Sequence, residues 1–214
     1  MKHMSIQVKI CGFREPEVVR SAVQAGADWI GFNFAKFSPR SIAPADLEHL
    51  LPAAKGADVI GLMADADDAL LNAVLGAGIR NIQLHGSESP ERLTEIKTRV
   101  SGEVWKAIGV KTSGDLLAAD VFEDADRLLI DAKAPEGTEQ AGGHGVPFDW
   151  SILESWQPAK PWFLAGGLDA TTVAEAIRCT GTDAVDVSSG VERQRGVKDA
   201  VLIREFIRAA KGTL

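Results

Sequence analysis

The chain has 214 residues, of which 45% are hydrophobic and 25% charged, and a formal net charge of −7. This length suits one domain with a full hydrophobic core, and the composition is that of a globular protein rather than a fibre or a disordered chain. Acidic and basic residues are mixed along the chain, which argues against nucleic acid as the main ligand. No apolar run approaches the ~18 residues of a membrane span and no secretory leader is evident, so we expect a cytoplasmic protein without a membrane segment.

Cys11 and Cys179 are the two cysteines. Two are too few for a disulfide framework and fit a reducing compartment. Together with scattered histidines they cannot make a closed zinc site, and we expect no bound metal. We expect a single domain over residues 1–214, with residues 1–4 disordered or artificially added.

The chain repeats one unit, a short apolar strand followed by a loop and an amphipathic helix. In the first unit, Ile6–Cys11 alternates apolar and polar residues, Glu15–Ala25 has helical spacing, and Gly26 stands where the helix should end. Ser89 before Pro90 is a typical helix start. The predicted strands cover residues 6–11, 29–34, 58–63, 81–85, 103–108, 127–131, 162–165 and 184–187, and the predicted helices begin near residues 15, 44, 67, 90, 113, 149, 171 and 197.

Eight such units in one domain predict an α/β fold, a (β/α)8 TIM barrel. An open doubly wound sheet also alternates strands and helices, but it usually carries a G-x-G-x-x-G turn after its first strand. Residues 11–16 do not match that turn. In a barrel the active site lies at the carboxyl ends of the strands, so the residues at those ends are the candidates for chemistry.

The last two strands end in turns that resemble a phosphate site. Gly166 and Gly167 follow one strand, and Ser188, Ser189 and Gly190 follow the next. Glycine lets backbone N–H groups approach an anion, and a following helix start adds positive charge. Either motif alone could be an ordinary turn, but their pairing at neighbouring strand ends predicts that a phosphate binds there.

Cys11, His85 and Asp131 close three other strands and can take part in proton chemistry. A free cysteine is more often a small buried hydrophobe, and Asp131 could simply cap its loop. Arg40 could bind a substrate carboxylate or hold its own loop, and Asp186 has the same two interpretations. No residue adjacent to Cys11 is an obvious activator, although Lys9 is close in the chain.

The longest predicted loop, 132–148, contains Gly142 and Gly143. Loops longer than about 12 residues without their own structure are usually functional lids or disordered segments. We expect a mobile loop over the site.

Together these motifs resemble phosphoribosylanthranilate isomerase, in the family's order and spacing from about Val8 to Lys211. They lie at residues 9–12, 31–34, 38–40, 83–86, 129–131, 142–145, 148–150, 165–168 and 185–192.

The resemblance implies a (β/α)8 barrel of tryptophan biosynthesis. It converts N-(5-phosphoribosyl)anthranilate to 1-(2-carboxyphenylamino)-1-deoxyribulose 5-phosphate, an Amadori rearrangement that uses no cofactor. By similarity, Asp131 is the general acid that opens the sugar ring and Cys11 is the general base that removes the C2 proton. Since the base must lose its proton near neutral pH, we expect the site to lower the pKa of Cys11.

The resemblance also places Arg40 at the anthranilate carboxylate and Asp186 in the pocket, and we group His85 with these substrate-binding residues. The glycine and serine turns match the family's phosphate site. The expected partner is a small phosphosugar, with no nucleic acid and no membrane, and the expected state is a monomer.

Three alternatives stay open. A metal-dependent sugar-phosphate epimerase would need histidines on adjacent inner strands, where this chain has Phe34 and Met63. Indole-glycerol-phosphate synthase would need a segment before the first strand and a catalytic lysine and glutamate. A non-catalytic phosphate-binding barrel would have no reason to keep Cys11 and Asp131.

Overall fold

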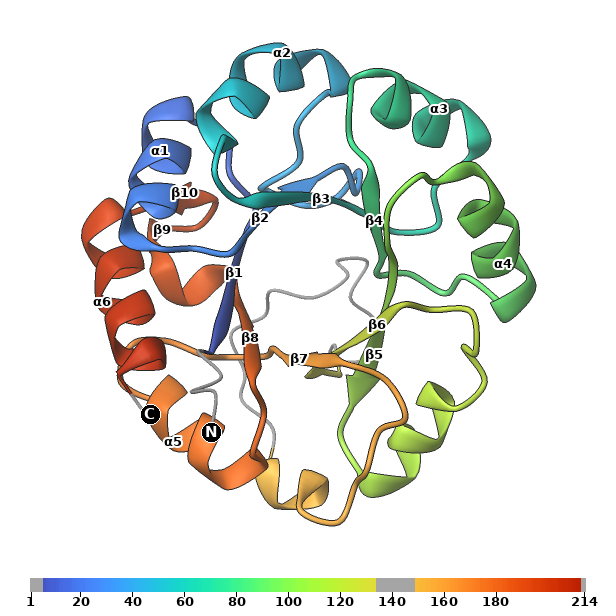
Figure 1. Ribbon diagram of the computed structural model, residues 1–214, viewed down its shortest axis with the longest axis vertical. Coiled ribbons are helices and arrows are strands. Elements are labelled where there is room, and N and C mark those ends of the chain that lie inside the picture. The colour runs from blue at the N-terminus through green and yellow to red at the C-terminus, as the bar shows by residue number, and fades with distance from the viewer. Residues whose placement is uncertain (1–5, 134–148, 213–214) are drawn as a thin grey trace.

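Eight parallel strands close into a barrel in chain order, β1 to β8, and helices surround it (Figure 1). The structure is a computed structural model that describes residues 6–133 and 149–212. The (β/α)8 barrel predicted from the sequence is therefore confirmed. The strands are β1 Gln7–Cys11, β2 Trp29–Asn33, β3 Asp58–Met63, β4 Asn81–Leu84, β5 Val104–Val110, β6 Arg127–Ala132, β7 Trp162–Leu164 and β8 Ala184–Val187.

The helices vary more in length than the strands do. α1 keeps the expected end at Gly26, whose φ of 99° is the left-handed conformation that glycine adopts without strain. Ser89 caps α4 by accepting a hydrogen bond from the Arg92 N–H. The α-helices are α1 Pro16–Ala25, α2 Leu47–Leu50, α3 Asp68–Gly76, α4 Pro90–Arg99, α5 Val173–Thr180 and α6 Ala200–Lys211, and the 3₁₀-helices are η1 Pro44–Asp46, η2 Leu51–Ala54, η3 Ser113–Ala119, η4 Trp150–Leu153 and η5 Ser189–Val191.

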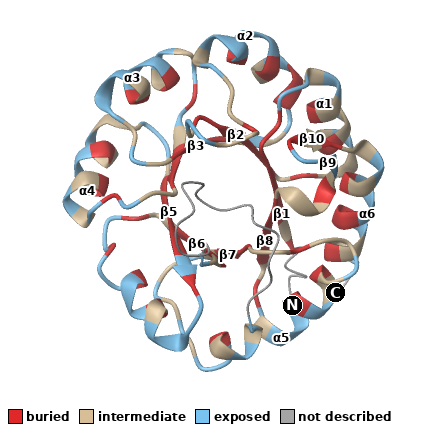
Figure 2. Cartoon of the chain, turned by 180° about the vertical axis from the view of Figure 1, so that it is seen from behind, coloured by how far each residue is buried: buried red, intermediate tan, exposed pale blue. Residues whose placement is uncertain are grey.

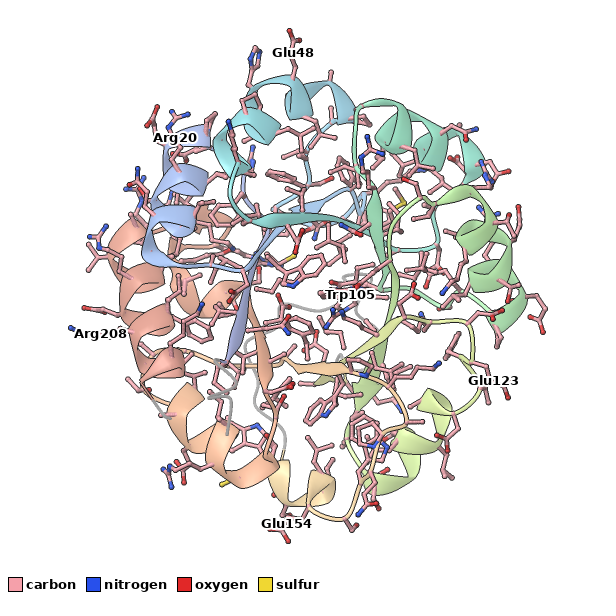
Figure 3. All side chains as sticks on the ribbon, viewed as in Figure 1. Arg20, Glu48, Trp105, Glu123, Glu154 and Arg208 are labelled. Carbon is pink, nitrogen blue, oxygen red and sulfur yellow. The ribbon has the colours of Figure 1, made fainter. Side chains whose placement is uncertain are left out.

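The strands are buried on both faces, while the outer faces of the helices are exposed (Figure 2). One face of each strand packs against the helices, and the other points into the barrel. Trp29, Trp105 and Phe163 form the centre of a separate apolar cluster inside the barrel, with ring centroids 4.6 Å apart in both contacts. Figure 3 shows Trp105 at the middle of the barrel, whereas the labelled arginines and glutamates project outward.

Four predicted helices differ from the structure. The helix expected from Pro44 is divided among η1, α2 and η2, and those expected from residues 113 and 149 are the 3₁₀-helices η3 and η4. The helix expected from Val197 begins at Ala200, because Val197–Lys198 is a strand, β10, that pairs antiparallel with β9 Glu192–Gln194. Asp199 caps α6 through the N–H groups of Val201 and Leu202, which fixes the later start. This β9–β10 hairpin was not predicted.

Candidate active site

The proposed acid and base lie at the carboxyl ends of their strands, as a barrel active site requires. Cys11 is the last residue of β1, and Asp131 is the last but one of β6. Both are largely buried, with 3% and 9% of their surface exposed. Figure 1 shows β1 and β6 on opposite sides of the barrel axis, so the two residues flank the same central space.

An ion pair inside the barrel lies beside Cys11. Lys9 Nζ is 2.7 Å from Asp186 Oδ1, and both side chains are buried. Burial alone would lower the pKa of Lys9, but Asp186 and Cys11 together raise it, so Lys9 stays an ammonium. For Cys11, burial outweighs the opposing effect of Lys9 and raises the pKa of the thiol. This corrects our expectation of a lowered pKa: the sequence does not reveal how completely the thiol is removed from water.

His85 connects Asp131 to Gln83. Its Nε2 lies 3.2 Å from Asp131 Oδ2, and its Nδ1 lies 2.8 Å from Gln83 Nε2. In this orientation the Gln83 amide donates to Nδ1, so the proton of the neutral ring is on Nε2. The Nε2–H group then donates to the Asp131 carboxylate. Gln83 Oε1 is buried without a hydrogen-bond partner among the described residues. In the reverse amide orientation Oε1 would accept from Nδ1–H, and His85 Nε2 could accept a proton from Asp131. His85 can thus pair with either form of the acid.

The two predicted phosphate turns lie against each other. A Cβ added to Gly190 would lie 1.9 Å from the Leu168 carbonyl oxygen, so the turn after β8 touches the turn after β7. A Cβ at Gly166 would lie 2.6 Å from the Ala132 backbone nitrogen and 3.1 Å from Asp131 Oδ1. Gly166 and Gly167 have φ values of 87° and 67°. The structure therefore brings together the glycines that the sequence assigns to one site, with Gly166 directly beside the proposed acid.

Ser188 joins the turn after β8 to the proposed base. Its hydroxyl donates to the Cys11 carbonyl oxygen at 2.9 Å. Lys198 Nζ lies 3.1 Å from the Ser188 carbonyl oxygen and 3.2 Å from its hydroxyl oxygen. Burial lowers the pKa of Lys198 to about 8, although Glu192 opposes this effect. Ser189, half-buried, begins the short 3₁₀-helix η5 that follows.

Arg40 is paired inside the protein rather than held by its own loop. Its Nε and one terminal nitrogen donate to the two Glu192 oxygens at 2.6 and 3.0 Å, and both side chains are almost fully buried. Lys198 donates to the same carboxylate at 2.6 Å. Burial works against ionisation of Glu192, but Arg40 and Lys198 outweigh it and lower the pKa of the carboxyl to about 2. Arg40 therefore connects its loop to β9 through Glu192, instead of bonding only within its own loop.

Gly142 and Gly143, the predicted mobile loop, lie outside the described residues. Within residues 6–133 and 149–212, no group of three or more histidine, cysteine or acidic side chains is placed to hold a metal ion. In the same ranges, no helix is long and apolar enough to cross a membrane.

Comparison with known proteins identifies the family. A model of the family described as N-(5'-phosphoribosyl)anthranilate (PRA) isomerase matches residues 8–209. The N-(5'-phosphoribosyl)anthranilate isomerase of Hyphomonas neptunium is 52% identical over 207 residues, which are 97% of this chain and 98% of that protein. The chain belongs to this isomerase family. The resemblance inferred from the sequence is confirmed, and the activity is isomerisation of phosphoribosylanthranilate in tryptophan biosynthesis.

Solved isomerases agree with this assignment. The enzyme from Thermotoga maritima superposes with a TM-score of 0.87 at 33% identity, covering 97% of this chain and 99% of that one. A second isomerase structure, with a TM-score of 0.82 and 31% identity over 97% and 99% of the chains, contains reduced 1-(o-carboxyphenylamino)-1-deoxyribulose 5-phosphate. A phosphosugar-type ligand is therefore established for that relative.

Four polar residues of this candidate site were not predicted from the sequence. Lys9 and Gln83 belong to strands, where the alternation of β1 and β4 could have indicated that they share the inner face with Cys11 and His85. Glu192 and Lys198 belong to the β9–β10 hairpin, and no sequence signal predicts that they meet Arg40.

Proposed function

We propose that Cys11 is the general base and Asp131 the general acid of the isomerisation. One observation carries this proposal: the two phosphate turns touch the acid and the base. Gly166 lies against the Asp131 carboxylate, and the Ser188 hydroxyl bonds to the Cys11 backbone. A substrate anchored by its phosphate at these turns would have its sugar between the two groups.

The chemistry then needs only proton movements. Asp131 gives a proton to the ring oxygen of the ribose, the bond from that oxygen to C1 breaks, and the anthranilate nitrogen forms a Schiff base. Cys11 takes the proton from C2, the electron pair of that C–H bond forms the C1=C2 double bond, and the π pair of the C1=N bond moves onto the nitrogen to give an enolamine. The enolamine becomes the ketone when its hydroxyl loses a proton and C1 gains one. Each step uses a general acid or base at a fixed position.

The phosphate is the best-supported part of the ligand. Backbone N–H groups at glycine turns bind anions without a large positive surface, which fits a chain with a net charge of −7. We propose Gly166, Gly167, Ser188, Ser189 and Gly190 as its ligands. Lys198 contributes a buried cation behind the second turn.

Arg40, His85 and Asp186 complete the proposed substrate site. Glu192 accepts from two of the five N–H donors of Arg40, so an anthranilate carboxylate would use the remaining donors or compete with Glu192. His85 contacts the Asp131 carboxylate directly, so its role is to support the acid rather than to bind another part of the substrate. Asp186 holds the Lys9 ammonium, which lies beneath Cys11 in the barrel.

The test is the conversion rate of freshly generated phosphoribosylanthranilate for Cys11→Ser and Asp131→Asn. Removing a general acid or base should lower kcat by about 10²- to 10⁴-fold. The matched controls are Cys179→Ser and Asp58→Asn, which change exposed residues away from the site and should keep full activity. Variants that retain more than a tenth of the wild-type kcat would refute the assigned roles.

We further infer that the enzyme needs no cofactor, because substrate and product are isomers and the reaction needs no electron donor or acceptor. Full activity in the presence of a chelator would support this. The monomeric state, the cytoplasmic location and closure of the loop containing Gly142 and Gly143 remain predictions. Sedimentation of the purified chain tests the first of them.

A further inference from the structure

A fully buried lysine lies beneath the proposed base. Lys9 is the third residue of β1, two before Cys11, so both side chains point to the same face of the strand. On the neighbouring strand, Asp186 is the register partner of Lys9 and holds its ammonium at 2.7 Å. Cys11 is the other side chain with which this ammonium interacts.

Fold stability does not explain this pair. Burying two opposite charges often stabilises a protein no more than apolar residues of the same size would. Another buried lysine pair, Lys106 with Glu88, has a clear structural role, because Lys106 also binds the Gly86 carbonyl oxygen and Glu88 accepts from the backbone N–H groups of Asp65 and Gly86. That pair ties two loops together. Lys9 makes no comparable loop contact among the hydrogen bonds of the described residues.

The charges that act on Cys11 favour its ionised form on balance. Lys9 on β1, Lys198 on β10 and Arg40 after β2 lower the pKa of the thiol, whereas Asp186 on β8 raises it. Glu192 pairs with both Lys198 and Arg40. Around an uncharged thiol, these three cations and two carboxylates leave one positive charge. A thiolate neutralises it.

We propose that Lys9, anchored by Asp186, is a positioning residue that holds the Cys11 sulfur and stabilises it as the thiolate that removes the C2 proton. The proposal rests on the proposed role of Cys11 as the base. As the proton moves from C2 to sulfur, Lys9 keeps its own proton, the electron pair of the C2–H bond forms the C1=C2 double bond, and the π pair of the C1=N bond moves onto the nitrogen. The anchor keeps the ammonium beside the sulfur in both states.

The test is an ultraviolet titration of the thiolate in the Cys179→Ser background, which leaves Cys11 as the one thiol. The chain has no tyrosine, so tyrosinate absorbance does not interfere. Lys9→Met should raise the midpoint of the Cys11 titration by about one to two pH units, because the substitution removes a neighbouring positive charge that favours the thiolate. The matched control is Lys106→Met, which removes another buried lysine and should lower the melting temperature without moving the midpoint. An unchanged midpoint in Lys9→Met would refute the proposal.

A second variant separates the loss of Lys9 from the exposure of a bare Asp186 charge. Lys9→Met with Asp186→Asn removes the whole pair and leaves no buried charge unpaired, which favours folding. We expect its midpoint to stay above that of the Cys179→Ser background and below that of Lys9→Met alone. A return to the background midpoint would show that only the unpaired carboxylate acts on Cys11, and would overturn the proposal.

Activity provides the second readout. The acidic limb of the kcat/KM profile of Lys9→Met should move to higher pH with the thiol midpoint, and activity should recover above the new midpoint. A structural role would lower activity at every pH. If instead Cys11→Ser is fully active, the proposed base is wrong, whereas the titration still reports whether Lys9 acts on the thiol. The two failures are therefore distinguishable.

Discussion

The interior of the barrel has two parts of opposite chemistry. The apolar cluster of Trp29, Trp105 and Phe163 comes from the first or second residues of β2, β5 and β7. The polar residues come from the middle and the carboxyl ends of other strands; they are Lys9, Cys11, Gln83, Asp131 and Asp186. Both parts are buried, so burial alone does not distinguish a packing residue from a functional one.

The difference shows how the barrel separates stability from chemistry. Side chains near the amino ends of the strands fill space with apolar rings. Those nearer the carboxyl ends are charged or hydrogen-bonded, and burying them costs free energy unless each finds a partner. Lys9 and Asp131 find theirs in Asp186 and His85. We therefore expect substitutions in the two parts to affect different measurements.

The largest loss of stability should follow Trp105→Ala. Trp105 is fully buried between Trp29 and Phe163, and its indole N–H donates to Glu103 at 2.6 Å. Removing a buried aromatic side chain should lower the free energy of unfolding by about 3–5 kcal/mol, measured by urea denaturation. At temperatures where the variant stays folded, kcat should change little.

The control is Trp156→Ala. Trp156 is half-buried and makes one edge contact with Trp162, with ring centroids 5.2 Å apart. Its loss should cost roughly 1 kcal/mol. If Trp105→Ala abolished kcat while the protein remained folded, the separation of the two parts would be wrong.

An acid-dependent effect should follow from Glu192, which lies in the polar part. Its pKa is lowered from 4.5 to about 2 by Arg40 and Lys198 against the effect of burial. The folded state binds fewer protons than the unfolded state between these values. The ionised carboxylate therefore stabilises the fold above pH 4.5, and this stability is lost as the pH falls towards 2. Its size is about 3 kcal/mol.

Glu192→Gln should lower the free energy of unfolding near neutral pH by about that amount. Between pH 4.5 and 2 it should flatten the fall in stability. Chemical denaturation at several pH values measures both effects. Glu48→Gln is the matched control, because Glu48 is exposed on the outer rim of the barrel (Figure 3) and should change neither quantity measurably. Equal pH curves for Glu192→Gln and the wild type would contradict the Arg40 and Lys198 pairing.

The strands could be predicted almost to the residue because each is an apolar or alternating run between turn residues. β3 and β8 have the predicted bounds. The helices expected from residues 44, 113 and 149 were less predictable, because η1, η2, η3 and η4 are 3₁₀ segments too short to show α-helical spacing. Cys11 and Asp131 could be named as candidates because each lies at the carboxyl end of a strand, and their roles stay predictions.

The partners of these residues could not be found in the same way. Arg40 and Glu192 are 152 positions apart in the chain, and their contact depends on how the β9–β10 hairpin folds back. The pKa of Cys11 also depends on burial, which no local pattern gives.

A substitution in the proposed phosphate turns tests the same separation of stability from chemistry, through the backbone rather than through a side chain. Gly190→Ala would place a Cβ 1.9 Å from the Leu168 carbonyl oxygen. Because that neighbour is backbone, the turn has to move, and the proposed phosphate ligands move with it. We expect kcat/KM to fall by about 10- to 100-fold, and competition by inorganic phosphate to weaken.

Gly76→Ala is the matched control. Gly76 lies in α3 with nothing within 4 Å of the added Cβ, and the substitution should raise stability by about 0.5–1 kcal/mol with kcat/KM unchanged. Unchanged competition by inorganic phosphate in a folded Gly190→Ala variant would mean that the phosphate binds elsewhere. The division of the barrel into an apolar and a polar part would then have to be assigned again from the true position of the ligand.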